Sequence, residues 1–132
     1  MLNANSNGTV YLNYDNATKL ATEETGIAVT GTLTATTVTE TSDERLKSDI
    51  KIIENGLDKV MNMRGVRFTR DNEPHIGVIA QEVEKIIPEV VTDGDYKSVA
   101  YGNMVGVLIE AVKDLKKELD EHKKGCTCGS NN

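Results

Sequence analysis

The stretch SDERLK, residues 42–47, divides this 132-residue chain into two parts of different composition. Before it lies a region rich in Thr, Gly and Asn, with sparse apolar residues. After it lies a segment of mixed pattern that ends in a long heptad helix. Ser42 and Lys47 supply a hydroxyl that can act as a nucleophile and an amine that can act as a base, five positions apart at this boundary. A Ser–Lys pair in this place indicates a chain that cuts itself there.

The composition restricts what a single copy of the chain can do. Aromatic residues make up 4% of the sequence, Trp is absent and there is one Phe. A monomer of this composition has a small, marginally stable core, so we expect identical subunits to bury apolar surface against one another. The net charge is −6 with both signs mixed, which argues against a nucleic-acid partner because phosphate binding needs a basic face.

The sequence lacks the signals of several other protein classes. There is no run of about 20 apolar residues, so neither a membrane-spanning helix nor a membrane partner is expected. The start, Met1–Asn5, lacks the basic and apolar regions of a signal peptide, and we expect Met1 to mark where a longer chain was divided. The absence of a phosphate loop, metal-ligand cluster or cofactor motif argues against a metabolic enzyme and against a bound cofactor or metal.

The two cysteines, Cys126 and Cys128, lie in Gly-Cys-Thr-Cys-Gly near the C-terminus. Two thiols are too few for a structural zinc site, which takes four ligands. Three interpretations stay open: residues 125–132 form a flexible tail with exposed thiols, the thiols form disulfides between chains, or three chains together capture a metal with His122 nearby.

Residues 1–41 predict a β-rich segment. Residues 9–14 alternate in polarity and end at the turn signal Asp15-Asn16, and residues 27–30 and 33–39 are further strand-like stretches. Apolar residues are too few for this segment to offset its chain entropy alone. The segment is therefore either disordered or completes its strands between identical chains, and the alternation favours the second.

Residues 42–124 predict a small mixed domain of short strands and helices, so the whole chain is expected to be α+β. We expect helices at 57–63 and 80–87, strands at 64–70 and 75–78 joined by a loop at 71–74, and a hairpin over 89–99.

The clearest element is a helix over residues 105–122. Its seam residues alternate three and four positions apart, which is the a/d spacing of a coiled coil: Val105, Leu108, Val112, Leu115, Leu119 and His122. Gly125 follows as a natural stop. A single amphipathic surface helix is the alternative, but the strict spacing and the thin upstream core favour self-association. The spacing alone does not choose between two strands and three.

Two motifs in a fixed order carry a family resemblance: SDERLKSDI at residues 42–50 and HIGVIAQEV at residues 75–83, followed by Tyr101 ahead of the terminal helix. Over residues 42–124 the chain resembles the C-terminal intramolecular chaperone domain of phage tail fibres, tail spikes, neck appendages and endosialidases, a self-cleaving module also found in the myelin regulatory factor. The resemblance implies a homotrimer that guides the folding of the fibrous region before it and then cleaves itself off.

The resemblance also implies the site of the cut. Cleavage falls between Thr41 and Ser42, with Ser42 as nucleophile and Lys47 as base. Residues 1–41 are then the end of a trimeric, intertwined β-rich tail fibre in the virion, and the chaperone domain is released in the host cytoplasm during assembly.

Three further residues are candidates for supporting roles: Asp43, His75 and Gln81. His75 is a candidate orienting group or donor, with a structural histidine at the start of a strand as its alternative. For Gln81 and the adjacent Glu82, the alternative is a place on a helix surface or in a buried polar network.

The chemistry sets a condition on the proposed cut. A Ser hydroxyl needs a base, and lysine is a poor one at its reference pKa of ~10.4. Burial disfavours the charged form and lowers that pKa, so a site assembled in a trimer makes cleavage depend on assembly. Attack on the Thr41 carbonyl gives an ester that water resolves, while a backbone N–H or a polar side chain stabilises the oxyanion.

Two alternatives compete with this interpretation. Thr41 and Glu44 fit the spacing of a capping box, in which case Ser42 belongs to a helix or turn cap and Lys47 is an ordinary surface lysine. At the level of the whole chain, the alternative is a structural or receptor-binding tip of a trimeric fibre that is not cleaved.

Overall fold

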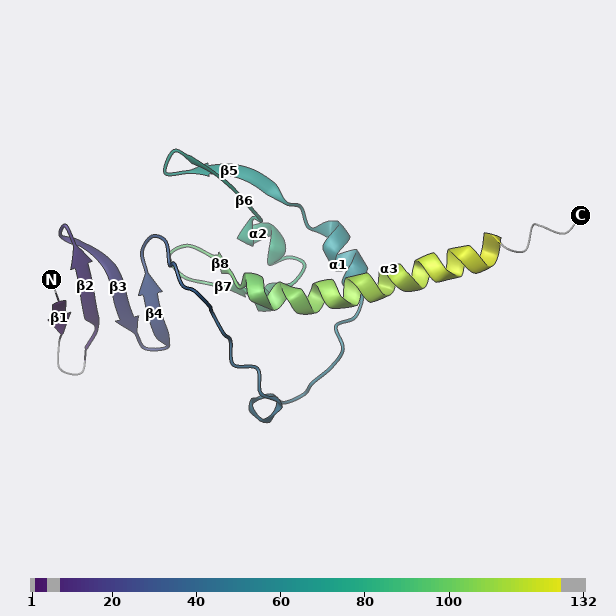
Figure 1. Ribbon diagram of the computed structural model, residues 1–132, viewed down its shortest axis with the longest axis horizontal. Helices are drawn as coiled ribbons and strands as arrows, with labels where there is room; N and C mark the ends of the chain where they lie inside the picture. Colours follow the sequence, from purple (N-terminus) through teal and green to yellow (C-terminus); the bar gives the residue numbers. More distant parts are fainter. Residues whose placement is uncertain (1, 5–7, 127–132) are drawn as a thin grey trace, which may run out of the picture. The chain divides into compact units, whose positions relative to one another are not determined.

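The computed structural model describes residues 2–4 and 8–126, which divide into one unit that ends at Ser48 and a second that begins at Asp49 (Figure 1). The first unit is built mainly of strands. The second combines short strands with helices and ends in the longest helix of the described chain. The predicted α+β class is confirmed.

The first unit is an antiparallel sheet whose strands follow one another in chain order: β1 (Leu2–Ala4), β2 (Val10–Tyr14), β3 (Ala17–Glu23) and β4 (Gly26–Val29). Asp15 and Asn16 join β2 to β3 with positive φ angles of 50° and 58°. Short polar residues tolerate this left-handed conformation, which a two-residue hairpin turn of matching twist requires. None of residues 8–48 is fully buried, so this part of the sheet has no core of its own in a single chain.

In this unit one sequence expectation was wrong and one strand was missed. Residues 33–39 form no strand, and Leu33 and Val38 lie exposed, because no neighbouring strand of the same chain pairs with this stretch. Conversely, β3 was not anticipated. Its residues alternate weakly, but β3 pairs with β2 on one side and β4 on the other, and those ladders satisfy its backbone groups.

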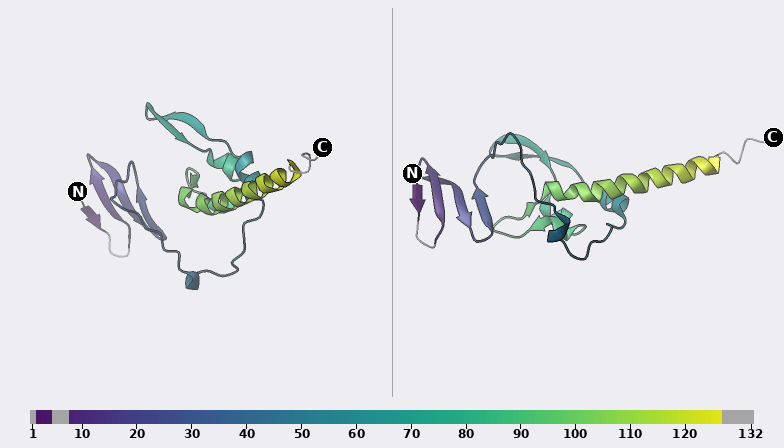
Figure 2. Two further views of the ribbon diagram at one scale, coloured as in Figure 1. Left: turned by 45° about the vertical axis from the view of Figure 1, so that its right-hand side comes forward. Right: turned by 60° about the horizontal axis from the view of Figure 1, so that its bottom comes forward.

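The second unit packs helices and short strands around a small core. In chain order its elements are α1 (Gly56–Asn62), β5 (Val66–Arg70), β6 (Glu73–Gly77), α2 (Ala80–Val83), the 3₁₀ helix η2 (Pro88–Val90), β7 (Val91–Thr92), β8 (Ser98–Val99), the 3₁₀ helix η3 (Tyr101–Asn103) and α3 (Met104–Cys126). Val83, Ile87 and Val90 pack with Val107 of α3 to form the core cluster. Figure 2 shows α1 packed against α3, with the β5–β6 hairpin projecting beyond them.

Three boundaries in this unit differ from expectation. The α-helix expected over 80–87 ends at Val83, because the chain turns there and carries Ile87 into the core. Pro74 belongs to β6 rather than to a loop, which is tolerated since a strand in a two-stranded sheet has a free edge. Helix α3 continues past Gly125 to Cys126.

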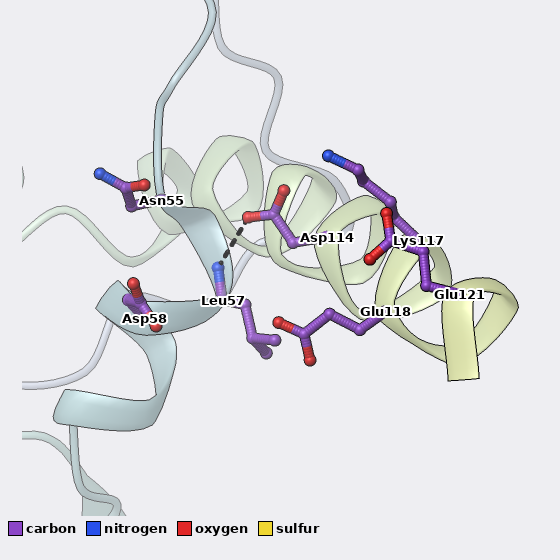
Figure 3. A pocket seen from close by; sticks show the side chains of 7 residues that line it. All are labelled: Asn55, Leu57, Asp58, Asp114, Lys117, Glu118 and Glu121. Atoms are coloured by element: carbon purple, nitrogen blue, oxygen red, sulfur yellow. Dashed lines mark hydrogen bonds between the residues drawn. The ribbon is translucent and has the colours of Figure 1, made fainter. Parts of the chain in front are cut away.

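Helix α3 holds the N-terminus of α1 in place. Asn55 precedes α1 in the left-handed conformation and makes no side-chain cap, and instead Asp114 of α3 accepts a hydrogen bond from the Leu57 backbone N–H at 3.1 Å (Figure 3). The backbones meet at Gly56, where an added Cβ would lie 2.5 Å from the Ala111 nitrogen. Only glycine fits this crossing without displacing a helix.

We expect Gly56→Ala to destabilise the second unit by about 2–3 kcal/mol, since the added methyl meets helix backbone that cannot rotate away. Urea unfolding followed by circular dichroism measures the loss. Gly65→Ala is the matched control, because nothing lies within 4 Å of a Cβ there and the expected change is small. Equal stability of the two variants would show that α1 and α3 separate readily.

Candidate active site

The structure brings the two candidate catalytic side chains into direct contact. Lys47 Nζ donates a hydrogen bond to Ser42 Oγ at 2.6 Å. A nucleophile and its base must lie within about 2.6–3.2 Å of one another for proton transfer, and this pair does. Both side chains are exposed in the single chain, so the short segment itself sets their contact without support from a core.

A single helical turn sets the distance between the two residues. The 3₁₀ helix η1 (Glu44–Leu46) lies between them, closed by hydrogen bonds from Leu46 N to Asp43 O at 3.1 Å and from Lys47 N to Glu44 O at 3.0 Å. Lys47 then leaves the turn in an extended conformation. Tight i to i+3 bonding compacts the chain, which returns a residue five positions on to the side chain of Ser42.

Asp43 organises this turn through what we term the Asp43–Arg45 clamp. Its carboxylate accepts a hydrogen bond from the Arg45 backbone N–H at 2.9 Å, which caps η1. The same carboxylate accepts hydrogen bonds from the Arg45 guanidinium, from Nε at 2.9 Å and from Nη2 at 2.6 Å. The capping box of Thr41 and Glu44, the alternative interpretation of this segment, is therefore wrong, because the cap is Asp43. Ser42 is not the N-cap of η1, and its hydroxyl contacts Lys47 instead.

The clamp is ionised at neutral pH. The side-chain hydrogen bonds from Arg45, followed by its backbone N–H, hold the pKa of Asp43 below its usual value of 3.8. A carboxyl whose pKa is lowered on folding contributes stability above its unfolded pKa of about 4, and loses it as the pH falls through the folded value. The clamp therefore stays charged in any neutral or alkaline solution.

The other two candidate supporting residues belong to the second unit. His75 lies on β6 with its ring stacked on Phe68, the centroids 5.6 Å apart. Gln81 is exposed in α2, and its neighbour Glu82 forms a two-bond ion pair with Arg64 at 2.9 and 2.7 Å. These contacts give His75 and Glu82 structural partners, and a role for His75 or Gln81 beside Ser42 stays a prediction.

Sequence reasoning missed two polar contacts that shape the site and its domain. Arg45 was not singled out, although an arginine two residues after an aspartate at a turn is a signal for such a clamp. Tyr101 accepts a hydrogen bond from the Val78 N–H at 3.2 Å, and its hydroxyl would lie 2.6 Å from a Cβ at Gly77. Tyr101 thus ties the end of β6 to the start of α3, and Gly77 leaves it room.

Several carboxylates line a hollow of the second unit, and one of them has a structural role. A hollow of about 280 Å³ beside α1 and α3 is lined by Asn55, Leu57, Asp58, Asp114, Lys117, Glu118 and Glu121 (Figure 3). Asp114 serves there as the partner of the Leu57 N–H. Among the described residues, no three His, Cys, Asp or Glu side chains of one chain are grouped to hold a metal ion, and no helix is long and apolar enough to cross a membrane.

Part of the C-terminal prediction falls beyond what the structure covers. Cys128 and the other residues of 127–132 lie outside the described residues, and of Cys126 only the backbone is described. The flexible tail and the pairing or metal capture by these thiols stay predictions.

Comparison with known proteins finds one matching family and several curated relatives. Residues 42–92 match the peptidase-type family described as chaperone of endosialidase. Curated relatives are long tail fiber proteins Gp37. That of Enterobacteria phage K3 is 33% identical over 93 residues, which span 61% of this chain and 8% of the relative. That of Salmonella phage S16 is 35% identical over 98 residues, spanning 63% of this chain and 13% of the relative. That of Enterobacteria phage M1 is 33% identical over 96 residues, which span 62% of this chain and 38% of the relative.

The chain therefore spans well under half the length of these curated relatives. The family match begins at Ser42, the residue whose hydroxyl contacts Lys47, and includes the second motif at residues 75–83. The resemblance predicted from the two motifs is confirmed, since residues 42–92 of this chain are similar to the chaperone-of-endosialidase family.

Proposed function

We propose that residues 42–124 are a trimerisation chaperone for the tail-fibre segment before them and that this domain releases itself by cutting the Thr41–Ser42 bond. The 2.6 Å contact between Lys47 Nζ and Ser42 Oγ, at the first residue of the family match, carries the proposal. Residues 1–41 would remain with the fibre of the virion, and the released domain would stay in the host cytoplasm where the fibre assembles.

The reaction proceeds through an ester within the chain. Neutral Lys47 takes the Ser42 hydroxyl proton, and Ser42 Oγ attacks the carbonyl carbon of Thr41. The carbon–nitrogen bond between the two residues breaks, and the lysine returns the proton to the departing Ser42 nitrogen. Water then hydrolyses the ester, leaving a carboxylate on Thr41 and a free amine and hydroxyl on Ser42.

Assembly supplies what the single chain lacks. An exposed lysine stays charged in water, whereas burial favours the neutral amine that the reaction needs. Three apolar side chains within five positions of Lys47 in sequence are strongly exposed in the single chain: Leu46 at 74%, Ile50 at 65% and Ile52 at 79%. Burying the part of the chain around Lys47 against further copies would cover these residues and would remove water from Lys47.

The apolar surface of the chain supports a homotrimer as the assembled form. The seam residues of α3 are exposed, and residues 8–48 contain no buried side chain. Both features are explained when three chains complete one another's sheets and coil their α3 helices together, the geometry that the family resemblance implies. The number of chains comes from the resemblance, since the seam itself fits two strands as well.

We expect Asp43→Ala to slow cleavage by about 10- to 100-fold, because loss of the clamp lets Ser42 and Lys47 drift out of reach. Asp43→Asn keeps a side chain that caps helices as well as aspartate does and should stay within a few-fold of the unaltered rate. Time courses of fragment formation by gel and mass spectrometry measure both. Full-rate cleavage by Asp43→Ala would show that the clamp does not position the pair.

The intact mass of the purified chain tests the function itself. Fragments of residues 1–41 and 42–132 are the expected products. A chain that stays whole after it has formed trimers would contradict the proposal and favour an uncleaved structural or receptor-binding fibre tip.

A further inference from the structure

One face of the β5–β6 hairpin is open in the single chain. Arg67 and Ile76 are direct partners across the two strands, so their side chains lie next to each other on one face. Both are exposed, Ile76 at 78%. The opposite face of the hairpin carries Phe68 stacked on His75. The open face therefore presents a cation beside an apolar side chain, and we call these two residues the Arg67–Ile76 patch.

The turn between β7 and β8 presents an anion beside an aromatic ring. Asp95 and Tyr96 lie in this turn and are exposed, Tyr96 at 91%. Lys97 braces the turn, because its Nζ donates hydrogen bonds to Glu84 at 2.8 Å and to Asp93. A braced turn holds its side chains in place before binding, which reduces the cost of ordering them in an interface. We call the two exposed residues the Asp95–Tyr96 patch.

The two patches complement each other in charge and in shape of side chain. Arg67 and Asp95 carry opposite charges, and neither takes part in an ion pair within the described part of the chain. The ring of Tyr96 can cover Ile76, and an arginine can also lie over the face of a tyrosine ring. Tyrosine and arginine are among the residue types enriched where interfaces gain most of their binding energy. Both patches are exposed in the single chain, so a second copy is the partner that supplies the complement of each.

The position of the patches along α3 suits contact between neighbouring copies. Figure 1 shows the β5–β6 hairpin and the β7–β8 turn at the same end of α3, its N-terminal end. Parallel coiling of the α3 helices, in the homotrimer of the proposed function on which this step rests, keeps these elements of all copies at one level. A contact between two different patches closes into a ring under three-fold symmetry and leaves neither patch unmatched. We propose that the Arg67–Ile76 patch of each copy binds the Asp95–Tyr96 patch of the next copy.

Light scattering over a dilution series, on full-length chains that also carry Ser42→Ala, tests the proposal. Arg67→Asp and Asp95→Arg each place like charges in all three contacts of the ring, so each should raise the concentration at the assembly midpoint about 10-fold. The two substitutions together exchange the charges and should return the midpoint to within about threefold of the parent, which a general loss of stability would not do. Glu89→Arg reverses the charge at another exposed position of the same unit and should assemble as the parent does.

Cross-linking identifies the copy that each patch contacts. Chains with Arg67→Cys and chains with Asp95→Cys, all with Cys126→Ser and Cys128→Ser, are refolded together and treated with oxidised glutathione, which accepts the electrons of the two thiols. We expect a disulfide-linked pair of chains in the mixture and none from either variant alone, since the contact joins two different patches.

The outcomes separate this inference from the proposed function. A trimer whose midpoint is unchanged by Asp95→Arg, and whose mixed chains do not cross-link, would overturn the contact and leave the chaperone proposal standing. Weaker assembly of both single variants without recovery in the exchanged pair would also overturn it, because the substitutions would then act on the fold and not on each other. A chain that stays monomeric at every concentration would overturn the proposed function together with this contact.

Discussion

The Ser42→Ala chain should remain whole under conditions in which the unaltered chain separates into fragments of residues 1–41 and 42–132. The substitution removes the oxygen that attacks Thr41, and no other hydroxyl contacts Lys47 Nζ in the described hydrogen-bond network. Lys47→Ala should fail equally, because it removes the base. Lys47→Arg should fail too, since a guanidinium stays protonated and cannot accept the serine proton. Intact mass after prolonged incubation measures each result.

Matched controls separate loss of chemistry from loss of structure. Ser48→Ala removes another exposed hydroxyl of the same motif and should leave cleavage unchanged. Thr41→Ala should be cut, because Thr41 contributes only its carbonyl. Ser42 and Lys47 are both exposed, so their variants should keep the circular dichroism spectrum of the parent. Normal cutting by Ser42→Ala would place the nucleophile elsewhere.

The elements that sequence predicted well are those whose pattern reflects local packing. The terminal helix is one, since its 3/4 spacing needs only a helix with an apolar face to be recognised, and α3 (Met104–Cys126) covers the expected range. The strands β5 and β6 are another, joined by Asp71 and Asn72, whose positive φ angles make a tight turn.

The errors fall where contacts between segments override local pattern. Strand β3 has weak alternation of its own but pairs on both sides, while residues 33–39 have strong β propensity and no partner within the chain. The 3/4 spacing of α3 points to its exposed seam, and it did not reveal a second apolar face, which is buried around Val107 and Ala111. A short window of sequence does not reveal non-local pairing of this kind.

For the candidate site, the two residues could be predicted from the sequence, but the local structure that brings them into contact could not. The five-residue spacing of Ser42 and Lys47 is neither helical nor extended, and it works because η1 compacts the chain between them. The role of Asp43 as cap and clamp needed coordinates, since Thr41 matched the capping pattern equally well in sequence. Assembly around the site stays a prediction of the exposed apolar residues and of the family resemblance.

Leu115→Asp should break assembly and, with it, cleavage. Leu115 is exposed in the single chain, so the substitution leaves the core around Val83 and Val107 intact. In the coiled coil it would bury a carboxylate from each chain in one layer, and an unpaired buried charge costs several kcal/mol, so the concentration needed for assembly should rise at least about 100-fold. Light scattering over a dilution series, on chains that also carry Ser42→Ala, measures this shift. Lys113→Asp puts a carboxylate on the same helix away from the seam and should assemble nearly as the parent does.

The same variants with Ser42 restored test the order of events. If Lys47 becomes a base only when the assembly buries it, the cleavage rate per chain should fall on dilution below the assembly midpoint, and Leu115→Asp should be cut slowly at concentrations where Lys113→Asp is cut at the parent rate. The rate should also rise with pH as lysine loses its proton, with no opposing contribution from the Asp43–Arg45 clamp, which is already ionised. Once the bond is cut, the chaperone domain must rebind as a separate molecule, so dilution disfavours its return and the fibre is trapped in its folded form. A refolding time course that follows oligomer mass and fragment mass together decides the order, because fragments appearing while the population is still monomeric would contradict activation by assembly even if Ser42 and Lys47 prove essential.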